Sequence, residues 1–376
     1  MTGKKSSGTG SSVQTGRLLS LDIYRGMTIA FMILVNTPGT WSHVYAPLRH
    51  AAWHGCTPTD LVFPSFLFIA GVAMWYSLKK FNFEFSGPSL VRIIRRVALI
   101  FAAGLFLNIF PFFIRDYSTL RIMGVLQRIA LAYGFAATIV LLVRKNYIWL
   151  TTLIILLGYW ALMHFFGGAD PYSLQDNFAL KVDKAILGEN HLYKGFGIPF
   201  DPEGLLSTLP AIGTVLLGFM AGNLISNFGI SWKSAIYLAI LGAALIAVGY
   251  IWGIYFPINK PIWTSSYVLY AGGISMIILS LMFIIVDIRG LRGWTGFFNA
   301  FGINPMATYI LAGVWTKTML NIKIGDASMY NWIFTHICSP LFEQQKMASL
   351  MFAIMQVLFI WIFGYILYRK KIIIKF

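Results

Sequence analysis

Residues 263–286 read WTSSYVLYAGGISMIILSLMFIIV, a stretch without a single charged side chain. A helix of about 20 apolar residues crosses the hydrocarbon core of a bilayer, so this stretch predicts a transmembrane helix. Comparable runs recur along the chain, and we predict an all-α, polytopic membrane bundle of about ten spans, or eleven. The ten segments are residues 18–37, 58–78, 93–113, 121–143, 147–166, 205–226, 234–254, 263–286, 300–320 and 347–368.

The composition of the 376 residues agrees with a bilayer. The chain is 58% hydrophobic and only 11% charged, with a mean hydropathy of +0.72. A soluble globular protein carries about 25% charged residues, so this chain has too little polar surface to remain dissolved in water. The composition therefore excludes a disordered protein, a small disulfide scaffold and a soluble enzyme.

The net charge of +16 would suggest nucleic acid in a soluble protein, but in a membrane protein the location of the charges decides its meaning. With the N-terminus in the cytoplasm and ten alternating spans, 17 of the 29 basic residues fall in cytoplasmic segments, against two acidic residues, Glu84 and Asp287. The longest exterior loop, residues 167–204, holds six acidic residues and three lysines. We predict cytoplasmic termini and no nucleic-acid partner.

The predicted organisation is a tail followed by one domain. Residues 1–16 are rich in Gly, Ser and Thr and are expected to be a disordered cytoplasmic tail. Residues 17–376 are expected to form a single transmembrane domain with exterior loops at 38–57 and 167–204. Cys56 and Cys338 both fall in exterior segments, and the sequence leaves open whether they pair.

Ionisable residues inside spans are costly, and they mark either function or a structural pair. Asp22 and Arg25 are three residues apart in the first span, so they share a helix face and can pair with each other. Gln127 and Arg128 are expected about two turns into the fourth span from its exterior end. That depth is too great for Arg128 to reach the surface, so it should face the bundle interior or a polar cavity.

The richest polar stretch is residues 36–64, NTPGTWSHVYAPLRHAAWHGCTPTDLVFP. Thr57 or Thr59 can cap the second helix, which leaves Asp60 at the positive end of the helix dipole. As a functional residue, Asp60 would orient His50 or His54 for proton transfer. The two histidines have the spacing of a metal pair, but no strong pattern of further ligands is present, so we predict no metal.

The order of short motifs along the chain resembles the heparan-α-glucosaminide N-acetyltransferase family of transmembrane acetyltransferases, particularly its bacterial members. The resemblance covers residues 17–368, nearly the whole chain. The matching segments lie at residues 21–26, 35–36, 50–55 (HAAWHG), 60–64 (DLVFP), 121–128 (RIMGVLQR), 201–206 (DPEGLL), 259–267 and 302–305 (GINP).

The resemblance implies an enzyme that moves acetyl groups from cytoplasmic acetyl-CoA to the amine of an amino sugar or glycan across the membrane. The family's active-site histidine falls on His50, and Asn36 is also placed at the active site. With Asp60 these form the predicted catalytic set. The resemblance further implies a homodimer and a multi-pass protein of the bacterial inner membrane whose active site faces the periplasm.

The remaining site residues are assigned to the two substrates. Arg25, Arg96, Gln127 and Arg128 are expected to bind acetyl-CoA, the arginines through its phosphates or along its path. The cytoplasmic arginines also serve as plain positive-inside anchors, and both interpretations stay open. The residues expected to contact the acceptor are Trp53, His54, Glu203 and Lys260.

Two mechanisms and one competing function remain at this stage. His50 can attack the thioester and carry the acetyl group, or it can deprotonate the amine while Asn36 stabilises the developing oxyanion. The competing function is a transporter or flippase that uses Asp22, Arg25, Asp60 and Arg128 as a polar pathway. The clustering of motif residues at one exterior site, without a visible internal repeat, favours the enzyme.

Overall fold

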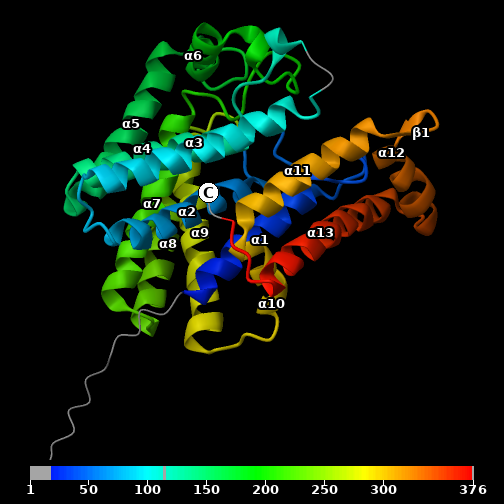
Figure 1. Ribbon diagram of the computed structural model, residues 1–376. Coiled ribbons are helices and arrows are strands. Elements are labelled where there is room, and N and C mark those ends of the chain that lie inside the picture. The colour runs from blue at the N-terminus through cyan, green and yellow to red at the C-terminus, as the bar shows by residue number, and fades with distance from the viewer. Residues whose placement is uncertain (1–17, 113–115, 375–376) are drawn as a thin grey trace, which may run out of the picture.

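The computed structural model describes residues 18–112 and 116–374, so the predicted tail at 1–16 lies outside the described residues. The regular secondary structure of the described residues is helical apart from one short hairpin, which confirms the predicted all-α class (Figure 1). The strands are β1 (Lys323–Ile324) and β2 (Ala327–Ser328). The helices are α1 (Leu19–Asn36), α2 (Val62–Lys79), α3 (Gly87–Ile109), α4 (Val125–Leu142), α5 (Ile148–Phe166), α6 (Phe178–Leu187), α7 (Thr208–Phe228), α8 (Trp232–Trp252), α9 (Ser265–Met282), α10 (Thr295–Ile303), α11 (Pro305–Asn321), α12 (Met329–Ile333) and α13 (Gln345–Arg369).

Nine of the ten predicted spans each fall on one long helix and the ninth falls on two, α10 and α11. Eight helices of the described residues are long and apolar enough to cross a membrane. The two others are α3 and α11. The first half of α3 carries Arg92, Arg95 and Arg96, and α11 has only 17 residues. The structure thus supports a multi-pass membrane protein, while the count of ten crossings stays a prediction.

The bundle has an inner and an outer set of helices. In α7, 78% of the most apolar window is buried inside the protein, against 28% in α5 and α8, whose remaining surface is free to face lipid. Glycines allow α2 and α7 to touch backbone to backbone. A Cβ added at Gly71 would lie 1.9 Å from the carbonyl oxygen of Val215, and one at Gly218 1.9 Å from that of Phe68.

Three local features differ from the sequence prediction. The ninth segment is broken at Asn304 into α10 and α11, because Pro305 has no N–H to continue a helix and instead starts the next one. The fourth helix begins at Val125 rather than 121. The loop 167–204 contains a helix, α6, which Asn177 caps by accepting a 2.8 Å hydrogen bond from the backbone N–H of Leu180.

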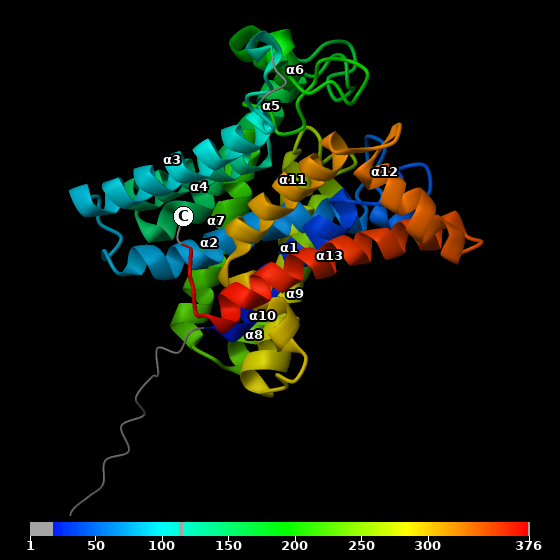
Figure 2. The ribbon, with the colours of Figure 1, turned by 45° about the vertical axis from the view of Figure 1, so that its right-hand side comes forward.

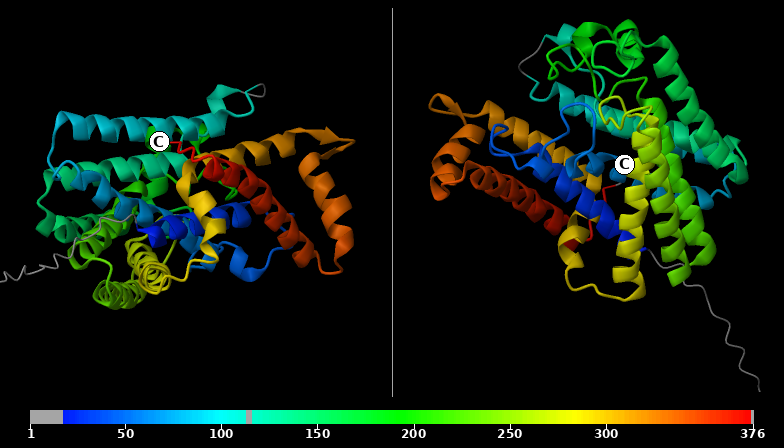
Figure 3. Two further views of the ribbon diagram at one scale, coloured as in Figure 1. Left: turned by 60° about the horizontal axis from the view of Figure 1, so that its bottom comes forward. Right: turned by 180° about the vertical axis from the view of Figure 1, so that it is seen from behind.

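Every second connection meets at one end of the bundle, which we call the loop-rich end: residues 37–61, 116–124, 167–207, 253–264 and 322–344. Backbone hydrogen bonds join these connections, including 2.7 Å from Gly55 N to Ile258 O and 3.3 Å from Ile122 N to His191 O. Figure 2 shows α6 and α12 at this end, and in the right panel of Figure 3 the connection after α1 lies between them. A chain that crosses the bundle back and forth returns to the same end after every second helix, so this arrangement is expected for alternating spans.

Candidate active site

The centre of the site is a histidine–carboxylate pair at the loop-rich end. His50 Nδ1 lies 2.6 Å from Oδ1 of Asp60, whose side chain is only 2% exposed, whereas that of His50 is 41% exposed. A buried carboxylate accepts the Nδ1 proton, so the Nε2 of His50 carries the lone pair and is the basic atom. The structure places Asp60 against His50 rather than His54.

Asp60 is fixed by its own segment of chain. It lies in the short 3₁₀ turn Pro58–Leu61 that leads into α2, and its Oδ2 accepts hydrogen bonds from the backbone N–H of Ala51 at 3.0 Å and of Thr57 at 3.1 Å. The Thr57 hydroxyl donates to the same oxygen at 3.0 Å. These three donors hold Oδ2 and leave Oδ1 for the imidazole, which is the arrangement that fixes a histidine tautomer.

Lys260 brings a positive charge beside this pair from the connection between α8 and α9. Its Nζ lies 3.1 Å from His50 Nδ1 and 3.5 Å from Asp60 Oδ1. An Nδ1 that donates to Asp60 cannot also accept from Lys260, so we assign the shorter contact as the hydrogen bond and Lys260 as a neighbouring charge. Burial lowers the pKa of Lys260, against the attraction of Asp60 and Glu203.

His54 and Trp53 are held at the edge of the site by other partners. His54 Nδ1 lies 3.2 Å from the side-chain nitrogen of Asn259, and partial burial lowers its pKa despite the opposing charge of Asp170. Trp53 donates a 2.9 Å hydrogen bond from Nε1 to the backbone carbonyl of Tyr172. The indole therefore ties the 167–204 segment to the segment that carries His50.

Glu203 belongs to an ion-pair network next to the site. Arg121 binds both oxygens of Asp201, at 2.8 and 2.7 Å, and donates to Glu203 Oε2 at 2.6 Å. Burial acts to lower the pKa of Arg121, but the hydrogen bond and charge of Asp201, together with Glu203, raise it overall. Arg121 is absent from the predicted site residues, although the RIMGVLQR motif contains it.

Arg128 and Gln127 do not lie two turns into a helix, as the sequence suggested. Because α4 begins at Val125, both are in its first turn, yet Arg128 is 0% and Gln127 1% exposed. Arg128 Nη2 donates to Ser207 Oγ and, at 3.2 Å, to the carbonyl of Gly204. Its guanidinium also lies 4.9 Å from the ring centre of Trp263. Arg128 is therefore buried by the connections that cover the start of α4, and not by its position along the helix. The expectation that it faces the protein interior is confirmed.

Asn36, Arg25 and Arg96 are not brought to the His50–Asp60 pair by any hydrogen bond among the described residues. Asn36 is exposed as the last residue of α1. Arg25 donates to Asp22 at 2.5 Å and to the carbonyl of Gly302 at 2.9 Å, which confirms the expected pairing with Asp22 and fastens α1 to α10. Arg96 lies over the ring of Tyr133, 4.2 Å from its centre.

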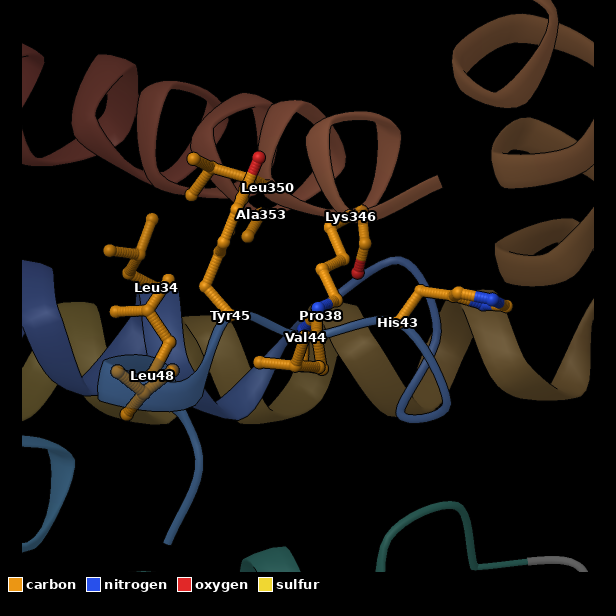
Figure 4. Close-up of a pocket in the computed structure, with 11 residues that line it drawn as sticks. Leu34, Pro38, His43, Val44, Tyr45, Leu48, Lys346, Leu350 and Ala353 are labelled. Carbon is orange, nitrogen blue, oxygen red and sulfur yellow. The ribbon is translucent and has the colours of Figure 1, made fainter. Parts of the chain in front are cut away.

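An apolar groove of about 260 Å³ runs along α1 and reaches the residues on either side of Asp60, although neither His50 nor Asp60 lines it. Its walls come from α1 (Tyr24 to Val35), from α2, from Ile278 of α9 and from the connection between α1 and α2, including Pro47 and Thr59. The pocket in Figure 4, between the end of α1, the following connection and α13, holds only about 10 Å³. That is room for about one water molecule, so the pocket is too small for a substrate.

The remaining polar groups give no metal centre within the described ranges. No group of three or more His, Cys, Asp or Glu side chains gathers there to hold an ion, and the expectation of no metal stays a prediction. Cys56 and Cys338 are both free thiols. Tyr267, a motif residue to which the sequence assigned no role, donates a 2.5 Å hydrogen bond to the backbone carbonyl of Asp60.

Known sequences match this chain over most of its length. The profile described as the catalytic region of heparan-α-glucosaminide N-acetyltransferase matches residues 17–250. The human heparan-α-glucosaminide N-acetyltransferase is 27% identical over 420 aligned positions, covering 96% of this chain and 60% of the human protein. The mouse protein of the same name is 27% identical over 359 positions, covering 78% of this chain and 53% of its own length.

The chain thus spans between half and two thirds of the length of these relatives. The profile match covers well over half of the chain and includes His50, Asp60, Arg121 and Glu203, while Lys260 and Tyr267 lie beyond its end. On this match, the protein belongs to the heparan-α-glucosaminide N-acetyltransferase family.

Proposed function

We propose that this protein is a transmembrane acetyltransferase, which moves an acetyl group from cytoplasmic acetyl-CoA to the amine of an amino sugar or glycan at the loop-rich end. The observation that carries the proposal is the 2.6 Å contact between His50 and the buried Asp60. This pair provides a base at a half-exposed position, which an acyl transfer to an amine needs. Family membership supplies the reaction class.

In the direct route, the nitrogen of the acceptor amine bonds to the thioester carbonyl carbon while His50 Nε2 takes a proton from that amine. The carbon–sulfur bond then breaks, CoA leaves as a thiolate, and the proton on His50 returns to the thiolate. Asp60 stabilises the imidazolium that forms in between. In the alternative route His50 is itself acetylated and passes the group to the amine. We favour direct transfer because an acyl-imidazole beside water would hydrolyse.

The apolar groove beside the pair is our proposed route for the donor. Tyr24 and Val35 are eleven residues apart on α1, so the wall between them is about 16 Å long at 1.5 Å per residue. An extended pantetheine arm can lay its methylene and dimethyl groups along this wall, and Pro47 and Thr59 line the end of the groove near Asp60. Gln127 and Arg128, which the sequence places along the path of the donor, do not line this groove. Their assignment to acetyl-CoA rests instead on their own buried side-chain donors.

Several buried hydrogen-bond donors lack a partner and would suit acetyl-CoA, whose phosphates and carbonyls provide oxygen acceptors. Among the described residues, Arg96 Nε, Arg128 Nε and Nη1, and Gln127 Nε2 are buried and have no hydrogen-bond partner. An unsatisfied buried donor costs about 1–3 kcal/mol, so each of these groups gains from a carbonyl or phosphate oxygen. Arg96 follows Arg92 and Arg95 at the start of α3, where we place the CoA phosphates.

We place the loop-rich end outside the cytoplasm, in the periplasm if the protein resides in a bacterial inner membrane. The charge distribution supports this orientation, because the opposite connections carry most of the basic residues. A homodimer stays a prediction. Lys260 lies 3.1 Å from His50, and Trp53 and His54 lie at the edge of the same site. We propose that these three side chains contact the acceptor.

The deciding experiment uses the purified full chain in detergent with labelled acetyl-CoA and glucosamine. We expect N-acetylglucosamine to form, and the His50→Ala variant to lose this activity. His43→Ala is the matched control, because His43 lies on the same connection and its side chain hydrogen-bonds to Ser42. Full activity of His50→Ala, or no transfer to any amino sugar, would contradict the proposal.

Reconstituted vesicles separate this function from transport. Glucosamine sealed inside and acetyl-CoA outside should yield acetylated sugar in vesicles whose loop-rich end faces inward. Movement of glucosamine without acetyl-CoA would instead establish the transporter. Incubation with labelled acetyl-CoA alone tests the direct route, since label that stays on the protein would show acetylated His50.

A further inference from the structure

The segment after α13 turns back onto the bundle. α13 ends in a Schellman motif, in which the backbone N–H of Ile372 donates to the carbonyl of Leu367 at 2.9 Å and that of Lys371 to the carbonyl of Tyr368 at 3.0 Å. Lys371 has a φ of 55°, in the left-handed region that glycine usually occupies. As a result, the red segment in Figures 1 and 2 runs back from the end of α13 toward α2 and α4. We call residues 370–374 the C-terminal strap.

One buried side chain binds the strap. Asn304, at the break between α10 and α11, is 0% exposed. Its Nδ2 donates to the backbone carbonyl of Ile372 at 2.8 Å, and its Oδ1 accepts the backbone N–H of Ile374 at 2.8 Å. A buried amide without partners is costly, and the strap satisfies both halves of this one. The GINP motif, to which the sequence assigned no role, thus provides the docking residue.

The strap itself is only half-buried. Ile372, Ile373 and Ile374 are 44%, 53% and 43% exposed, so little apolar surface is buried where they dock. Segments with few buried apolar contacts open locally at low free energy, while the protein around them stays folded. We therefore expect the strap to exchange between this docked state and a released state, and the two hydrogen bonds of Asn304 to decide the balance.

The docking residue is joined to the first half of α1. Gly302, two residues before Asn304, accepts a 2.9 Å hydrogen bond from Arg25 Nε. The backbones of α1 and α10 touch there, because a Cβ added at Gly302 would overlap the carbonyl oxygen of Asp22. A shift of the end of α10 is therefore passed on to α1.

This part of α1 is where the proposed donor route begins. Tyr24, next to Arg25, lines the apolar groove at the end opposite Pro47 and Thr59. Arg25 is itself one of the residues expected from the sequence to bind acetyl-CoA. The positions of Tyr24 and Arg25 thus depend on the end of α10, which the strap holds through Asn304.

We propose that the C-terminal strap positions the donor site: by docking on Asn304 it fixes the end of α1 at which acetyl-CoA enters. The inference rests on the proposed function and deepens it, because the affinity for the donor then depends on a segment remote from His50. The docked strap and the bound donor favour each other, since both require the same position of α1.

Carboxypeptidase digestion of the purified full chain in detergent, followed by mass spectrometry, measures docking directly. The protease removes only a released end, so the rate of trimming past residue 374 reports the released fraction. We expect Asn304→Leu, which loses two hydrogen bonds, to be trimmed about tenfold faster than the unaltered protein, and acetyl-CoA to slow the trimming of the unaltered protein. Asn299→Leu is the matched control, because Asn299 lies on the same helix and its Oδ1 has no hydrogen-bond partner among the described residues. Equal rates for all three proteins, or no effect of acetyl-CoA, would overturn the proposal.

Shortened chains test the effect on the donor. A chain that ends at Lys371 keeps α13 but loses both backbone partners of Asn304, and we expect its KM for acetyl-CoA to rise about fivefold at an unchanged kcat. A chain that ends at Ile374 keeps both hydrogen bonds and is the control. Adding Asn304→Leu to the chain that ends at Lys371 should raise the KM no further, because both changes remove the same contact. Fully additive effects, or an unchanged KM in the shorter chain, would also overturn the proposal.

Calorimetric titration of acetyl-CoA separates the strap from the proposed function. If no amine is acetylated but the chain that ends at Lys371 binds acetyl-CoA about fivefold more weakly than the full chain, the strap stands and the acetyltransferase proposal fails. If an amine is acetylated and the two chains bind acetyl-CoA equally well, the strap alone fails.

Discussion

The Tyr267 hydroxyl donates a 2.5 Å hydrogen bond to the backbone carbonyl of Asp60, 207 residues away, so the start of α9 holds the turn that carries the proposed catalytic carboxylate. Both partners are buried. We expect Tyr267→Phe to cost about 1–3 kcal/mol, because it leaves a buried carbonyl unsatisfied. Thermal unfolding should show a lower midpoint, and kcat should fall with little change in the KM for acetyl-CoA. An unchanged kcat would mean that Asp60 does not depend on Tyr267 for its position.

Asp60→Asn tests whether the carboxylate fixes the His50 tautomer. The amide keeps the shape of the side chain but can present N–H to Nδ1, which would move the imidazole proton to Nε2 and remove the base. We expect kcat to fall about 10²–10⁴-fold, with folding judged by gel filtration. Asp170→Asn, an exposed change in the 167–204 segment, is the control. Retention of more than a tenth of the activity would rule out this role.

Filling the groove beside α1 should hinder the donor and not the acceptor. Met27 is half-buried and lines the groove, so Met27→Trp is expected to raise the KM for acetyl-CoA several-fold while the KM for glucosamine stays constant. Ile236→Trp, on the exposed face of α8, adds the same side chain outside the groove. Equal effects of the two variants would argue against the groove as the route of the donor.

The Arg121 network and an exposed ion pair differ in their expected contribution to stability. Arg121→Met leaves the carboxylates of Asp201 and Glu203, which are 0% and 13% exposed, without their cation. Removing one partner of a buried pair costs about 3–5 kcal/mol. Lys184→Met breaks the pair with the 60% exposed Glu189 and should stay within about 0.5 kcal/mol. Equal unfolding midpoints would contradict this difference.

Cys56 should react slowly with maleimide at neutral pH. Burial and the charge of Asp60 raise the pKa of its thiol to about 12, although Lys260 opposes the shift. Below this pKa the reactive thiolate is a small fraction that rises about tenfold with each pH unit, so labelling of the folded protein should be slow at pH 7 and accelerate steadily up to pH 10. Denatured protein should label fast at both cysteines. Rapid labelling of folded protein at pH 7 would contradict the raised pKa.

The sequence predicts the helices well because each span is a local property of about 20 residues. The features that the sequence prediction missed depend either on contacts between distant segments or on short local signals. Asn177 and Gly188 are typical cap residues and mark the two ends of α6, although the prediction treated this segment as an acidic loop. The break at Asn304 could have been read from Pro305. The late start of α4 accompanies contacts that a single sequence does not reveal, since Arg121 pairs with Asp201 and Glu203 and Asn108 binds the carbonyls of Arg121 and Met123.

The candidate site could be predicted only in part, because it also depends on contacts between segments that are far apart in the sequence. The sequence places Asp60 within reach of two histidines, and only the path of residues 50–57 selects His50 over His54. Lys260 and Tyr267 reach the site across more than 200 residues, and a single sequence gives no distance between such segments. Asn36 remains an assignment by resemblance.

The parallel bridge between Gly55 and Asn259 joins the connection that carries His50 to a segment that is synthesised much later. His50 emerges from the ribosome long before Lys260, which follows 210 residues later. A nascent chain that has released α1 to α8 therefore already holds its histidine and carboxylate but lacks the lysine and the tyrosine that complete their surroundings. On the proposed mechanism, we expect activity only after the start of α9 has docked, and faulty insertion of that helix should leave the protein inactive although His50 is present.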